Sequence, residues 1–96
     1  MLLKLGVDIS RLKSPIRRSL TLIEIIFASN SSEEAVITST YEGDHSPGSY
    51  HYVDLAIDIR NPKEVKKVVL ALKSRLGSDY DVVDEHDHIH IEYDPK

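Results

Sequence analysis

The segment 88–93, which reads HIHIEY, constrains the fold most, because polar and apolar side chains alternate along it without a break. Alternation with a period of two predicts a β-strand that packs one face on a core and leaves the other face open. The three apolar residues then face the core. His88, His90 and Glu92 share the opposite face, where polar chemistry can take place.

The same kind of pattern predicts the other elements. Strands are expected at 35–41, at 53–59 and at 80–84, and a tight acidic turn joins the last of these to 88–93. One helix is expected from Ser14-Pro15 to about Asn30, and a second from Asn61-Pro62 to Gly77, where Asn61 and Glu64 form a capping box. The element order predicts one α+β domain over residues 1–96, with a small antiparallel sheet and two helices.

Composition excludes several classes of protein. The 96 residues contain no cysteine, which excludes disulfide scaffolds, thiolate zinc fingers and cysteine nucleophiles. The net charge of -4 argues against a nucleic-acid partner. No segment reaches the ~18 apolar residues of a membrane-spanning helix. Because the first residues also make a poor secretory signal, we expect a cytoplasmic monomer without a membrane partner.

All 5 histidines fall between His45 and His90, in two stretches that are also acidic. Imidazole and carboxylate without thiolate form a ligand set that suits zinc or a harder divalent ion. Catalytic zinc typically takes three protein ligands and leaves a fourth position to water. A histidine and an aspartate from the segment 50–58, with a histidine from 85–92, would supply that set. The competing interpretation is a group of solvated histidines on acidic loops.

Two motifs together resemble a known family. Ser49-x-His51-x-x-Asp54-x-Ala56-x-Asp58, followed by the segment 87–93 (DHIHIEY), is similar to the hallmark of the M15 family of zinc DD-peptidases. That family includes D-Ala-D-Ala carboxypeptidases, dipeptidases and phage L-alanyl-D-glutamate endolysins, and its fold is shared with the hedgehog signalling domain. The resemblance runs from about residue 37 to residue 93. It implies a hedgehog/DD-peptidase-like fold, Zn2+ as cofactor and a peptide or peptidoglycan fragment as substrate. It also implies an alternative location, as a phage-encoded protein released at lysis.

The resemblance also assigns zinc ligands. It makes His51 the first ligand and Asp58 the second, and His90 is the best match for the third ligand. His88 remains an alternative for the third position.

Three further residues have expected roles in catalysis. With zinc polarising the scissile carbonyl, a carboxylate would take a proton from water and return it to the leaving amine. Glu85 and Asp87 are both candidates for this base. His88, as the neighbouring histidine, would donate to the developing oxyanion.

The chain departs from the family pattern at two places. Asp54 stands where the family has glycine, and aspartate is among the few other residues that tolerate a left-handed backbone. The segment 39–42 (STYE) lacks the arginine that family members use to hold the substrate carbonyl. His45 could take the place of that arginine, but we expect it to be solvated.

Three functions are therefore open. The first is a zinc-dependent peptidase acting on cell-wall peptides that contain D-amino acids, of carboxypeptidase or endolysin type. The second is a non-catalytic zinc-binding domain of the same fold, serving as a binding or virion-associated module. The third is a metal-free acidic interaction domain.

Overall fold

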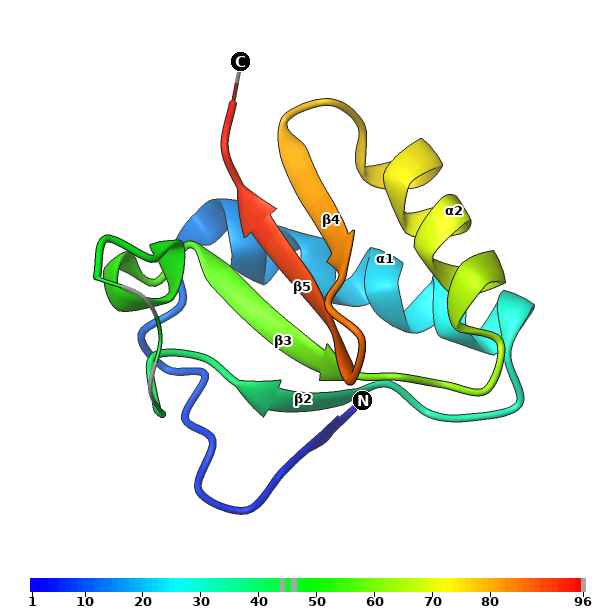
Figure 1. Cartoon of the computed structure of the whole chain (residues 1–96), viewed down its shortest axis with the longest axis horizontal. Helices are drawn as coiled ribbons and strands as arrows, with labels where there is room; N and C mark the ends of the chain where they lie inside the picture. The colour runs from blue at the N-terminus through cyan, green and yellow to red at the C-terminus, as the bar shows by residue number, and fades with distance from the viewer. Residues whose placement is uncertain (44, 46, 96) are drawn as a thin grey trace.

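The elements form a sheet of five strands with two α-helices (Figure 1). The computed structural model describes residues 1–43, 45 and 47–95. In chain order the elements are β1 (Leu2–Leu3), α1 (Ser14–Asn30), β2 (Val36–Ser39), the 3-10 helix η1 (Tyr50–Val53), β3 (Ala56–Arg60), α2 (Val65–Leu76), β4 (Tyr80–Asp84) and β5 (His88–Tyr93). The α+β class and the two helices are confirmed.

The sheet is mixed rather than purely antiparallel, which corrects the prediction. Its strand order is β1-β2-β3-β5-β4, and β1 pairs parallel with β2 while the other neighbours are antiparallel. The parallel pair arises because the chain leaves β1, passes through α1 and returns to β2 in the same direction. With only 2 residues, β1 has no alternation that a sequence pattern could reveal.

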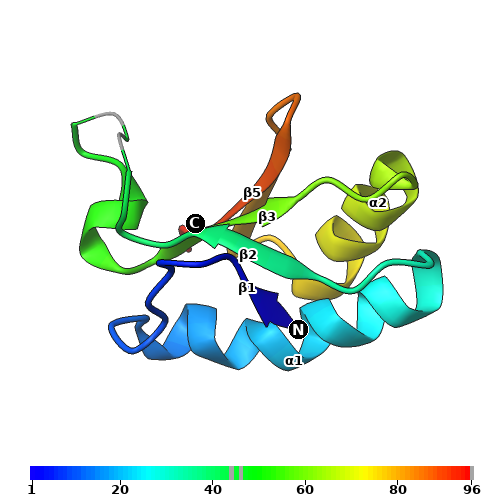
Figure 2. The ribbon, with the colours of Figure 1, turned by 90° about the horizontal axis from the view of Figure 1, so that it is seen from below.

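One face of the sheet is packed against the helices. Ile57 and Ile59 of β3 and Ile89 and Ile91 of β5 are fully buried, in one core with apolar residues of both helices. In Figure 2, α1 runs beneath the sheet, while the β4–β5 turn rises on the opposite side. The polar residues of β5 therefore lie on the open face, as the alternation predicts. Within the described ranges, no helix combines the length and apolar character needed to cross a bilayer.

The two helices match their predictions unequally. Helix α1 has the predicted bounds, although Lys13 rather than Ser14 is its N-cap residue. Helix α2 begins only at Val65, so the capping box predicted at Asn61 is wrong. The Asn61 amide instead donates to the carbonyl of His86, and this bond ties the start of the helix to the β4–β5 turn. Local capping is thus replaced by a tertiary contact.

The strand predicted at 53–59 begins only at Ala56, because the residues before it form η1. The Ser49 hydroxyl accepts a hydrogen bond from the His51 N–H and starts this short helix. Asp54 ends it in the left-handed conformation, with φ 63°. Aspartate is among the few residues other than glycine that tolerate this conformation. His51 consequently sits on a helical turn that faces the sheet.

Candidate metal centre

Three side chains from η1, β3 and β5 meet on the open face of the sheet. Asp58 and His90 are opposite each other in the β3–β5 ladder, and η1 brings His51 over them. His51 Nε2 lies 3.1 Å from Asp58 Oδ1, His90 Nδ1 lies 3.0 Å from the same oxygen, and the two nitrogens are 3.2 Å apart. The structure thus brings together the three residues that the resemblance suggests as zinc ligands.

In both His51 and His90, the outer ring nitrogen, which is the one that does not face Asp58, lies within hydrogen-bond distance of an acceptor. His51 Nδ1 lies 2.6 Å from the carbonyl oxygen of Thr40, and His90 Nε2 lies 2.7 Å from Glu92 Oε1. Because a carbonyl or carboxylate only accepts, each of these nitrogens carries the proton and donates. In the neutral rings, the inner nitrogens therefore turn lone pairs toward Asp58. Outer partners of this kind orient histidine ligands in metal sites.

The resulting triangle of donor atoms fits a divalent metal ion. In tetrahedral zinc sites with bonds of about 2.0–2.2 Å, ligand atoms lie about 3.3–3.6 Å apart, slightly farther than the 3.0–3.2 Å found here. His51 is 2% exposed and Asp58 is 7% exposed, so little water can screen their lone pairs. Three lone pairs at this distance require a cation between them, either a proton or a metal ion.

The pKa values of the cluster follow from the same contacts. Burial alone would raise the pKa of Asp58, but His51 and His90, when each ring carries a second proton on its inner nitrogen, donate to the carboxylate and hold this pKa well below its usual range. Burial would lower the pKa of His90, but hydrogen bonds to Asp58 and Glu92 outweigh it and raise the pKa to about 8. The raised pKa of His90 favours a second proton on this ring, beside the Asp58 carboxylate, when no metal is bound.

His45 is part of the centre rather than solvated, which corrects the expectation for this residue. Its ring stacks on that of His51, with centroids 3.8 Å apart. Its Nε2 lies 2.7 Å from the carbonyl oxygen of Glu42 and therefore carries a proton, which leaves the lone pair on Nδ1. His45, His51 and Asp58 each offer a ligand atom within 4.8 Å of one another, so this group could also hold a metal ion.

The predicted catalytic residues lie around the same centre but in different settings. A cavity of about 370 Å³ opens over the triangle, and Glu85 and His88 line it together with His45 and Ser49. His88 Nε2 is 3.6 Å from Asp58 Oδ1, farther than the nearer nitrogen of His90. The Asp87 carboxylate is 81% exposed and lies 2.6 Å from His88 Nδ1. Asp87 therefore orients His88, whereas Glu85 borders the cavity itself.

Glu42, near the position where the family has arginine, has a structural role. Its carboxylate accepts hydrogen bonds from the N–H groups of Asp8 and Thr40 and from the Thr40 hydroxyl. These bonds fix the turn after β2, whose Thr40 carbonyl holds His51. Among the described residues that line the cavity, none is an arginine or a lysine.

Two groups of this centre were not assigned from the sequence. The Thr40 carbonyl leaves no side-chain signal, because any residue can offer it. Glu92 could have been found, since it shares a strand face with His90 two positions earlier.

The chain was compared with models of known protein families, with curated proteins and with solved structures, and none of them matches.

Proposed function

We propose that this protein is a zinc-dependent peptidase with a hedgehog/DD-peptidase-like fold, acting on cell-wall peptides that contain D-amino acids. The observation that carries the proposal is the triangle of inward-facing lone pairs from His51, Asp58 and His90. The substrate class rests on the M15-like motif, which supplies what the geometry alone does not.

His51, Asp58 and His90 are the residues that would hold zinc. Their donor set of two imidazoles and one carboxylate is a common one for catalytic zinc. When bound, zinc would polarise a carbonyl group and lower the pKa of water. Thr40 and Glu92 keep the two imidazole rings in the tautomers that metal binding requires.

Glu85 and His88 would carry out the proton transfers. Glu85 lines the cavity with an exposed carboxylate, which suits a base that takes a proton from water and delivers it to the leaving amine. His88 turns Nε2 toward the cavity because Asp87 holds Nδ1. In its protonated form His88 can donate to an oxyanion from this position. Asp87 is thereby a positioning residue for His88.

The first experiment is an assay of the zinc-loaded protein on defined peptidoglycan fragments, with products identified by mass spectrometry. We expect cleavage of a peptide bond, and a loss of about 10²–10⁴-fold in kcat in Glu85→Gln. In Asp87→Asn we expect a smaller loss of kcat, because His88 keeps its place on β5. A Glu85→Gln variant as active as the wild type would contradict this assignment of the base.

A second candidate is a zinc-binding module of the same fold without catalysis. It is favoured by the absence of arginine and lysine among the described residues that line the cavity. An enzyme of this kind would have to hold the substrate carbonyl by other means. Zinc binding together with no cleavage of any fragment would favour this candidate over the peptidase.

A further inference from the structure

The outer edge of β4 exposes main-chain hydrogen-bonding groups beside the metal centre. β4 is the last strand of the sheet and pairs only with β5 among the described strands. The Glu85 N–H donates to the His88 carbonyl, and the Asp94 N–H donates to the Asp79 carbonyl. In an antiparallel ladder hydrogen-bonded pairs alternate, so Val83 is also in such a pair. It follows that the N–H and C=O of Val82 point away from β5, toward the free edge.

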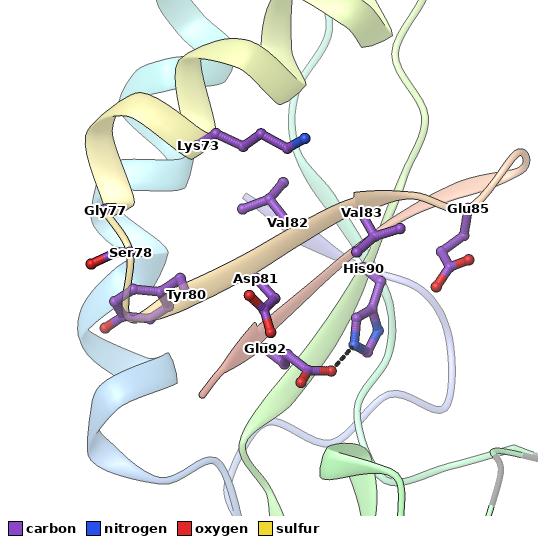
Figure 3. A pocket seen from close by; sticks show the side chains of 10 residues that line it. All are labelled: Lys73, Gly77, Ser78, Tyr80, Asp81, Val82, Val83, Glu85, His90 and Glu92. Atoms are coloured by element: carbon purple, nitrogen blue, oxygen red, sulfur yellow. Dashed lines mark hydrogen bonds and ion pairs between the residues drawn. The ribbon is translucent and has the colours of Figure 1, made fainter. Parts of the chain in front are cut away.

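A groove of about 690 Å³ follows this edge and reaches His90, one of the three proposed ligands (Figure 3). Its wall includes the β4 residues Tyr80 to Val83 at one end and His90 and Glu85 at the other. The same two residues also line the cavity over the donor triangle, so the groove and the cavity adjoin each other there. Lys73 extends from α2 along the groove in Figure 3, and it is the only cationic side chain among the described lining residues apart from His90.

We propose that the β4 edge binds the part of the peptide substrate that lies away from the scissile bond. An extended segment would pair with the N–H and C=O of Val82, and a carboxylate of the substrate would meet Lys73. Addition of a strand to a free sheet edge is a common mode of peptide recognition, because main-chain groups complement each other without regard to side chains. This inference rests on the proposed peptidase function and specifies the form of its substrate.

The sheet geometry sets how far this segment lies from the reacting bond. Val83, His90 and Asp58 form one row across β4, β5 and β3, with their side chains on the open face. Strands are spaced by about 4.8 Å, so the β4 edge is roughly 10 Å from the donor triangle. An extended peptide covers that distance with about three residues. Substrates should therefore need about three residues between the scissile bond and the paired segment.

Hydrogen exchange tests the pairing without relying on turnover. The zinc-loaded Glu85→Gln protein is mixed with a saturating synthetic stem pentapeptide of alternating L- and D-residues, and amide exchange is followed by NMR. We expect the Val82 amide to exchange at least about tenfold more slowly with peptide, since it gains a hydrogen bond. The Val83 amide, which already bonds to β5, is the internal control and should not change.

Two pairs of variants test the two proposed substrate contacts, with Val82 and with Lys73, by enzyme kinetics. Val82→Pro removes the outward N–H but no bond of the β4–β5 ladder, and we expect about a tenfold rise in KM relative to Val82→Ala, which keeps the N–H. Lys73→Gln should raise KM about fivefold for a peptide with a free carboxylate and not for its amide. Lys67→Gln, an exposed lysine earlier on α2, is the charge-matched control.

The outcomes separate the two proposals. If the pentapeptide is cleaved while the Val82 amide stays unprotected and Val82→Pro equals Val82→Ala, the β4 edge is not the binding site and the peptidase function stands. If zinc is bound but the pentapeptide is neither bound nor cleaved, the result contradicts both the peptidase function and the binding of substrate at the β4 edge.

Discussion

The position of one proton on each histidine ring decides the chemistry of the centre. The Thr40 carbonyl and the Glu92 carboxylate accept hydrogen bonds from the outer N–H groups of His51 and His90, so the inner nitrogens of the neutral rings present lone pairs to Asp58. Residues that would not touch a metal ion thus orient the side chains that could hold one. This is also the level at which sequence reasoning stops, because a backbone carbonyl leaves no trace in the residue pattern.

Removing the outer partner of His90 should weaken zinc binding without removing a ligand. In Glu92→Ala the His90 ring loses the acceptor at Nε2, and we expect zinc affinity to fall about 10–100-fold. Asp81→Ala, which removes the carboxylate opposite Glu92 on β4, is the matched control and should keep its affinity. Affinities can be measured by competition with a zinc chelator. Equal affinities for the two variants would contradict the role of Glu92.

The choice of Glu85 over Asp87 as the proposed base also illustrates what a sequence can predict. Strand parity places His88, His90 and Glu92 on one face, and the structure agrees. The two acidic residues lie in and beside the turn between β4 and β5, where parity gives no guidance. Only the turn geometry, with His86 in a left-handed conformation, turns Asp87 toward His88 and leaves Glu85 at the cavity.

Strand β5 divides stability and chemistry between its two faces. Ile89 and Ile91 are fully buried against the helices, while His90 faces the metal centre. The alternating pattern was sufficient to predict this strand and its two faces. It was not sufficient for β1, which has only 2 residues, or for η1, whose formation depends on the Ser49 cap and the left-handed Asp54.

Neighbouring substitutions on β5 should therefore have opposite effects. Ile91→Ala should lower the free energy of unfolding by about 2–5 kcal/mol, because it leaves a cavity in the core. The protein that remains folded should still bind zinc. His90→Ala should abolish zinc binding and leave the core intact. Urea unfolding and zinc analysis of both variants check this. A His90→Ala variant that still binds zinc would contradict the proposal that the open face of β5 holds the metal ion.

The turn after β2 links the N-terminal segment to the centre through Glu42. Burial alone would raise the pKa of this carboxyl group, but hydrogen bonds from Thr40 and Asp8 hold it below its usual range. Because the folded-state pKa is depressed, the stabilisation is present above the unfolded value of about 4.5 and is lost as pH falls through the folded value.

Glu42→Gln should consequently cost stability in a pH-dependent way. We expect the variant to be less stable than the wild type by about 1–2 kcal/mol at pH 7, since bonds to a charged acceptor are weakened. The difference should shrink as pH falls below about 4, where the wild-type carboxyl group takes up a proton. Urea unfolding at several pH values measures it, and a difference that stays constant down to pH 3 would contradict the role of Glu42.

In the molecule as a whole, the proposed ligands join segments that are far apart in the chain. His51 and His90 are separated by 39 residues, and the turn that carries Thr40 is fastened to the N-terminal segment through Glu42. A metal ion between them would hold η1 against the sheet in the folded state and would have no such site in the unfolded chain.

Zinc should therefore raise the thermal stability of the protein. At a free zinc concentration 100 times the Kd, linkage gives about 2.7 kcal/mol, which corresponds to a rise in Tm of about 10 °C or more for a domain of this size. Asp58→Ala should show no such rise, and excess chelator should reverse it in the wild type. Calorimetry with and without zinc measures the effect.

We propose that His51, Asp58 and His90 together bind a zinc ion. Elemental analysis of the protein purified without an affinity tag and equilibrated with zinc tests it most directly. We expect about one zinc ion per chain in the wild type and in His45→Ala, and none in Asp58→Ala or His90→Ala. A wild-type protein without zinc, or a His90→Ala variant that keeps it, would contradict the claim.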